Sequence, residues 1–158
     1  MTNNTNETKN AEIFFSIQRI YLKDCSFETP HAPEIFREEW QPKVDFELQI
    51  MTQQLDVETY EVSIWGTTTA NMNGKIAFLA EAKQAGIFTL RNIPTDQIPL
   101  LLNITCPTIL FPYFRETISN LISRGSFPQL ILDPINFEAL YQQKISAAES
   151  SSSKETVQ

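Results

Sequence analysis

The stretch that most constrains this fold covers residues 106–125 and reads CPTILFPYFRETISNLISRG. Pro107 stands where a helix would begin, because its fixed φ and missing N–H are tolerated at the first helical position. Apolar side chains then recur at helical spacing, and Arg124 followed by Gly125 is a helix stop signal. We therefore predict one long helix that ends at Arg124, with an irregularity caused by Pro112, which cannot donate a backbone hydrogen bond.

The start of this helix carries more aromatic surface than a single apolar stripe needs. Phe111, Tyr113 and Phe114 lie within four residues of one another. A large apolar surface that one small core does not require is typical of an interaction site or an oligomer interface. We expect the helix to pack on a sheet through one side and on another chain through the other. The alternative is that every Phe is core and the excess serves only self-association.

Strand patterns occupy the chain ahead of the helix. Period-two alternation predicts four strands over residues 13–27, 44–50, 60–69 and 76–88. In the first, we expect Phe15, Tyr21 and Phe27 to share the buried face. Asn73–Gly74 separates the last two strands and predicts a tight hairpin, since both central residues of a type I′ turn need positive φ. Gly86 is expected to bend or end the fourth strand.

Two further helical segments complete the pattern. A short one runs from Gln97 to Thr105, and Pro107 is expected to stop it from continuing into the long helix. A last helix is expected to start after Asp133 as cap, with Phe137, Leu140, Tyr141 and Ile145 on one stripe. A block of strands followed by helices indicates an α+β fold, a four-stranded antiparallel sheet with two main helices packed on one face.

The two ends of the chain differ in composition from its middle. Residues 1–12 are polar, and residues 146–158 include a run of four Ser. We expect both tails to be disordered and residues 13–145 to form a single domain.

The charge is strongly acidic, with a net value of −7 at pH 7. Because such a surface repels phosphates, nucleic acid is an improbable partner and a basic polypeptide a more natural one. Cys25 and Cys106 are too few for a disulfide framework, and we expect two free thiols in a reducing compartment. The sequence has no apolar run long enough for a membrane span and no signal-peptide core, so we expect a cytoplasmic protein without direct membrane insertion.

The residues that usually carry catalysis are sparse. His31 is the one histidine and lies between Pro30 and Pro33, where packing or exposure is the simpler interpretation. The sequence holds no HExxH, CxxC, GxSxG or phosphate-binding loop. Asp45 and Glu47 share one strand face, and a metal or glycosidase-type pair there is a remote alternative. We expect a binding protein rather than an enzyme, with no cofactor and no metal.

Several motifs together resemble the bacterial protein-export chaperone family SecB. They are collinear between about residues 13 and 145, and the CP–ILFPY–RE run is the most specific of them. The motifs are IQRIYLKD at 17–24, SFE at 26–28, WQP at 40–42, GIF at 86–88, CP at 106–107, ILFPY at 109–113, RE at 115–116, SRG at 123–125, FP at 127–128 and PINF at 134–137.

The resemblance implies ATP-independent holding of non-native precursor proteins and their delivery to the SecA motor of the Sec pathway. It also implies a homotetramer, a dimer of dimers with the long helices between sheets. The SecA element that binds the family is a basic, zinc-carrying C-terminal tail, so the zinc belongs to the partner. A SecB-like chaperone dedicated to a narrow partner such as an antitoxin is the alternative.

The resemblance also assigns residues. The acidic SecA-binding set maps onto Asp24, Glu28, Leu79 and Glu81. Asp24 and Glu28 share one parity of their strand, and Leu79 and Glu81 share one parity of theirs. The positions that affect tetramer assembly map onto Ala80, Ala82 and Gln84. The apolar candidates for client binding are Trp40, Val44, Phe46, Leu48, Phe137 and Tyr141. Phe46 and Leu48 could equally be plain core. Trp65 is less typical of the family, and its position alone indicates no function.

Overall fold

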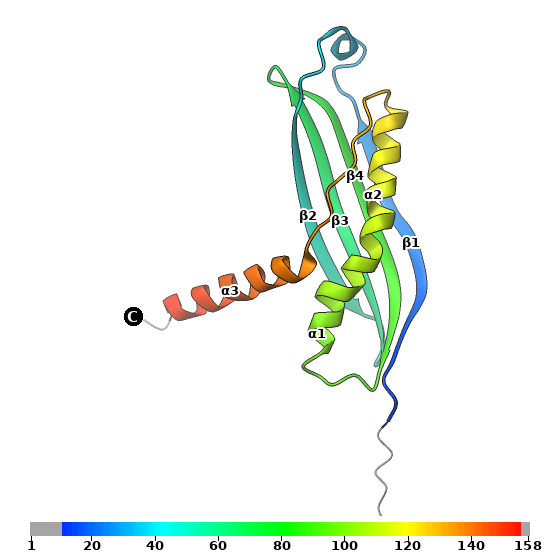
Figure 1. The fold of residues 1–158 in the computed structure, drawn as a ribbon, viewed down its shortest axis with the longest axis vertical. Helices are drawn as coiled ribbons and strands as arrows, with labels where there is room; N and C mark the ends of the chain where they lie inside the picture. The colour runs from blue at the N-terminus through cyan, green and yellow to red at the C-terminus, as the bar shows by residue number, and fades with distance from the viewer. Residues whose placement is uncertain (1–10, 156–158) are drawn as a thin grey trace, which may run out of the picture.

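A computed structural model describes residues 11–155 of the chain, which form one antiparallel sheet and the helices that follow it (Figure 1). The strands are β1 (Phe14–Glu28), β2 (Lys43–Gln54), β3 (Thr59–Met72) and β4 (Lys75–Arg91), in the spatial order β1-β4-β3-β2. The other elements are η1 (Glu34–Arg37), α1 (Ile98–Leu100), η2 (Leu101–Thr105), α2 (Cys106–Arg124) and α3 (Phe137–Glu155). The expected α+β architecture is confirmed.

The β3–β4 hairpin has the predicted turn. Asn73 and Gly74 adopt φ of 52° and 75°, the left-handed values that a type I′ turn requires. Beyond it, the register places Gly66 opposite Ala82 and Val62 opposite Gly86, so the even-numbered residues of β3 and β4 share one face. Of the two effects expected at Gly86, a bend or an end of the strand, the end is ruled out, because β4 continues to Arg91.

The first strand departs from simple alternation. Its pairing with β4 shifts between Ile17 and Arg19 and again between Leu22 and Asp24. Each shift inserts one extra residue and exchanges the two faces of the strand. As a result Ile20, rather than Tyr21, joins Phe15 and Phe27 against the core, and the predicted buried face is wrong in its middle part.

Helix α2 covers one face of the sheet, which we call the covered face. Two glycines let α2 lie close to the sheet. If Gly66 carried a Cβ, that atom would lie 2.3 Å from Cζ of Phe114, and a Cβ on Gly86 would lie 3.0 Å from a methyl of Leu110. Phe114 and Leu110 are fully buried. No helix of residues 11–155 lies on the opposite face, and we call it the open face (Figure 1).

The helical path from residue 98 to 124 is continuous, which contradicts the expected break before Pro107. Leu101–Thr105 is a π-helical turn, in which the N–H of Cys106 reaches the carbonyl of Leu101. The wider turn carries the chain into α2 with Pro107 in its first turn. Pro112 lies inside α2 without ending it.

Helix α3 begins later and ends later than predicted. Asn136 rather than Asp133 caps it, since its side-chain oxygen accepts from the N–H of Ala139 at 3.0 Å. The helix continues to Glu155 through the Ser-rich stretch that we expected to be disordered. There, hydroxyls such as that of Ser150 donate to carbonyls one turn earlier. Figure 1 shows α3 leading away from the sheet. Residues 1–10 of the expected N-terminal tail lie outside the described residues.

The segment between β1 and β2 crosses from one edge of the sheet to the other. Trp40 anchors it, with ring centroids 5.4 Å from Phe127 and 6.3 Å from Phe78. Phe36 also packs on Phe127 at 5.1 Å. His31 holds the same segment through Nδ1, which lies 3.1 Å from the carbonyl oxygen of Ile76. The histidine therefore has a structural contact, as its position between two prolines suggested.

Candidate functional site

The four predicted SecA-binding residues lie together on the open face. Across β1 and β4, Glu28 pairs with Leu79 and Ser26 pairs with Glu81. Asp24 pairs with Lys83, the next pair on the same face. Asp24 and Glu28 are exposed, and Leu79 and Glu81 are half-buried. We call these four residues the acidic docking surface. Two strands that are distant in sequence bring them together, as the parity of each strand suggested.

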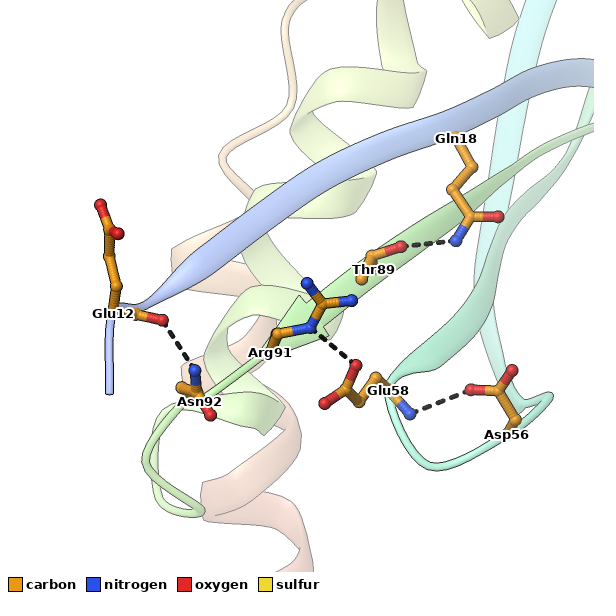
Figure 2. Close-up of polar contacts among 7 residues, drawn as sticks. All are labelled: Glu12, Gln18, Asp56, Glu58, Thr89, Arg91 and Asn92. Carbon is orange, nitrogen blue, oxygen red and sulfur yellow. Dashed lines mark hydrogen bonds and ion pairs between the residues drawn. The ribbon is translucent and has the colours of Figure 1, made fainter. Parts of the chain in front are cut away.

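The carboxylates of the open face are neutralised at one end of the sheet only. At that end, Glu58 accepts from Nε of Arg91 at 2.9 Å and Glu61 accepts from Nζ of Lys23 at 2.8 Å. Figure 2 shows the first of these pairs beside the side-chain bond from Gln18 to Thr89. Among the described residues, no lysine or arginine forms an ion pair with the acids of the docking surface.

Glu61 is the centre of a network that sequence reasoning missed. Its carboxylate accepts from the hydroxyl of Tyr21 as well as from Lys23, both on β1, across the intervening strand β4. Burial pushes the pKa of Glu61 upward, but the bonds from Lys23 and Tyr21 lower it overall. Burial and the Glu61 carboxylate raise the pKa of Tyr21 to about 12. The sequence pattern did not indicate this network, because a register shift in β1 brings Lys23 to the open face.

The six client-binding candidates divide into two groups. Phe46, Phe137 and Trp40 make ring contacts inside the chain: Phe46 with Phe114 at 6.1 Å, and Phe137 with Phe111 at 5.9 Å. Phe137 is only 2% exposed, so it has a core role in this chain. Of the three others, Val44 is exposed and Leu48 and Tyr141 are half-buried, as Phe46 and Trp40 also are.

Leu48 and Tyr141 line the same cavity, an open groove of about 550 Å³ between β2, the π-helical turn and α3. Its other lining residues include Ile50 and Leu140, which sequence reasoning did not select. Gln49, Asn103, Gln143 and Lys144 add polar groups to the lining. A mainly apolar groove with few fixed polar groups suits side chains of varied shape.

The predicted assembly residues are buried within one chain. Ala80 and Ala82 are fully buried and Gln84 is 4% exposed. They lie on the covered face with Gly66, and the Gln84 side-chain amide donates to the carbonyl of Tyr21 at 3.0 Å. Any influence of these residues on assembly therefore acts through the packing of α2 and β1 rather than through direct contact.

A family model described as preprotein translocase subunit SecB matches residues 8–148. The chain belongs to the SecB family. Its relatives include the protein-export protein SecB of Legionella pneumophila strain Corby, 51% identical over 90% of this chain and 87% of that protein. The SecB of Paraburkholderia phymatum is 50% identical over 87% of this chain and 88% of its own.

A solved structure shares the SecB fold. It is a SecB-like chaperone of Mycobacterium tuberculosis in complex with a ChAD peptide from the HigA1 antitoxin. The similarity has a TM-score of 0.64 at 19% identity and covers 77% of this chain and 90% of that one. Within the described part of this SecB family member, no helix has both the length and the apolar character to span a membrane. Nor do His, Cys, Asp and Glu gather there in a cluster of three or more suited to a metal ion.

Proposed function

We propose that this protein holds non-native precursor proteins without ATP and delivers them to SecA in the cytoplasm. Membership of the SecB family carries this proposal, because the relatives named for protein export are about half identical to this chain over most of its length. The antitoxin-linked protein shares the fold at much lower identity, which favours the general role over a dedicated one.

Client holding is assigned to the groove between β2 and α3. An unfolded chain exposes apolar side chains that a folded protein hides, and burial of such a side chain contributes about 1.5–3 kcal/mol. Leu48 and Tyr141 supply the apolar walls. Because the groove recognises exposure rather than sequence, binding removes clients from folding by mass action.

Aggregation of a denatured client tests this assignment. We expect the chain to suppress light scattering of the diluted client without nucleotide, and Tyr141→Ser to weaken that suppression. Leu100→Ser is the matched control, since Leu100 is an apolar side chain 43% exposed outside the groove. Equal loss in both variants would show that the groove is not the client site. No suppression by the unaltered chain would refute the holding function.

SecA delivery is assigned to the acidic docking surface. Its three carboxylates without ion pairs complement a basic tail. Asp24→Lys or Glu81→Lys should weaken SecA binding while client holding stays intact. Parallel loss of both activities in either variant would mean that the substitution damages the fold or that the surface is wrongly assigned.

Assembly as a homotetramer is a further part of the proposal. Membership of the SecB family and the exposed edge strand β1 both support it. β1 is an edge strand of 15 residues with exposed apolar side chains at Ile17 and Leu22, 44% and 46% accessible. An unpaired edge with such side chains is a template for pairing with another strand. Sedimentation should give a particle of four chains, and a monomer at micromolar concentration would refute this.

A further inference from the structure

Trp65 stands beside the acidic docking surface and contacts one of its residues. It lies on the open face of β3, opposite Lys83 of β4, and its side chain is 41% exposed. The indole N–H donates to Oε1 of Glu81 at 2.5 Å, and the hydroxyl of Thr67 lies 3.5 Å from the same oxygen. The indole N–H therefore holds the Glu81 carboxylate through one oxygen, with the Thr67 hydroxyl close to the same atom.

The same indole forms a wall of a hollow in the open face. The hollow has a volume of about 200 Å³ and is lined by Asp24, Cys25, Ser26, Trp65, Glu81 and Lys83. Two carboxylates and the indole therefore line a space that is large enough for one long side chain. A lysine or arginine over an indole face is attracted by the ring quadrupole, and nearby carboxylates add to that attraction.

We propose that Trp65 is a specificity-determining residue for SecA, with two roles. Its ring receives a lysine or arginine side chain of the basic SecA tail, and its N–H holds the Glu81 carboxylate for the same cation. The inference rests on the proposed SecA contact and adds a residue to it. Charge complementarity selects this occupant, because the carboxylates in the hollow outnumber its one lining cation, Lys83.

Substitutions at Trp65 separate the two roles. A zinc-loaded peptide of the SecA C-terminal tail is titrated into the full-length oligomer. Trp65→Phe keeps a ring and loses the N–H, so binding should weaken about threefold. Trp65→Val keeps a strand-favouring residue and loses both contacts, so binding should weaken about tenfold. Gln53→Val is the matched control, on the same face of the β2–β3 pair but toward its other end, and should stay within about twofold.

The fluorescence emission of Trp65 tests for direct contact with the peptide, because a purely structural tryptophan would not change its emission when the peptide binds. The chain has two Trp, so Trp40→Phe leaves Trp65 as the single emitter. Its emission should shift on addition of the tail peptide, and the shift should be lost when the lysines and arginines of the peptide are replaced by Gln. Lys83→Gln should tighten binding, because it removes the like charge from the hollow.

The outcomes distinguish this inference from the proposed function. If the unaltered chain binds the peptide while Trp65→Val binds equally well and the Trp65 emission does not change, the role of Trp65 is refuted and the SecA contact stands. If the unaltered chain does not bind the peptide, both are refuted. Client holding by each Trp65 variant shows that the variant is folded.

Discussion

Gly66→Ala is expected to destabilise the protein, although alanine normally strengthens a strand. The new methyl group would lie 2.3 Å from Cζ, 2.9 Å from Cε2 and 3.2 Å from Cε1 of Phe114. The ring cannot simply turn away, since Phe114 is fully buried and packs on Phe46 and Phe111 with centroids 6.1 Å apart in each case. Either α2 lifts from the sheet or the ring leaves its rotamer.

The expected cost follows from two opposing effects. Overpacking of a filled core costs about 1–3 kcal/mol, whereas replacing glycine by alanine restricts the unfolded chain and recovers about 0.4–1 kcal/mol. The net loss should be about 1–2 kcal/mol. For a domain of this size, each kcal/mol lowers the Tm by about 2–4 °C. Thermal and urea unfolding are compared at one fixed protein concentration, because assembly contributes to the apparent stability.

Phe114→Leu supplies the partner variant for this test. Removing the ring should itself destabilise the fold, but it also removes the atoms that the new methyl group would meet. The two substitutions together should therefore cost at least about 1 kcal/mol less than the sum of their separate effects. Additive effects, or a Gly66→Ala protein as stable as the unaltered one, would refute the close contact between β3 and α2.

Three further predictions concern side chains whose environments are unusual. Burial raises the pKa of Cys106 to about 12, so iodoacetamide at pH 8 should modify Cys25 and spare Cys106 by mass spectrometry; comparable rates would contradict the packing. The folded-state pKa of Glu61 is lowered, so its contribution to stability is present above the ordinary carboxyl pKa and disappears as pH falls through the folded value. Glu61→Gln should therefore lose about 0.5–1 kcal/mol at pH 7 in urea unfolding, and this loss should shrink as the pH falls below the ordinary carboxyl range; a pH-independent difference would count against the network. The buried hydroxyl of Thr68 has no hydrogen-bond partner among the described residues, so Thr68→Val should raise the free energy of unfolding by about 1 kcal/mol, and a lower Tm would contradict this.

Local sequence rules predicted the elements whose causes are local. The Asn73–Gly74 turn and the end of α2 at Arg124 follow from residues adjacent to each boundary. The sheet order does not, because pairing of β1 with β4 depends on contacts between distant segments. The β1 register shifts, at Gln18 and Lys23, were also invisible, since nothing in an alternating pattern marks the residue that will be skipped.

The docking surface was also predictable in part: the residues within each strand were, but the pairing of the two strands was not. Parity placed Asp24 and Glu28 together on one strand and Leu79 and Glu81 on another, and the register brings the two pairs side by side. The contact between Trp65 and Glu81 required knowledge that β3 lies next to β4 with this register. For the groove, the helix start at Asn136 decides which α3 residues face β2. The expected stripe of the last helix already held Leu140 beside Tyr141, but only the position of this part of α3 next to β2 marks Leu140 as a groove residue.

The crossing segment between β1 and β2 has a consequence for the order of folding during synthesis. β2, β3 and β4 form a meander in which each strand can pair with the next as soon as it leaves the ribosome. β1 is made first, yet its partner β4 is the last strand to emerge, and the amide of Asn92 bonds the carbonyl of Glu12 across 80 residues of chain. The first strand of a protein proposed to hold unfolded chains must therefore wait unpaired, with its own apolar side chains exposed, until the fourth is complete.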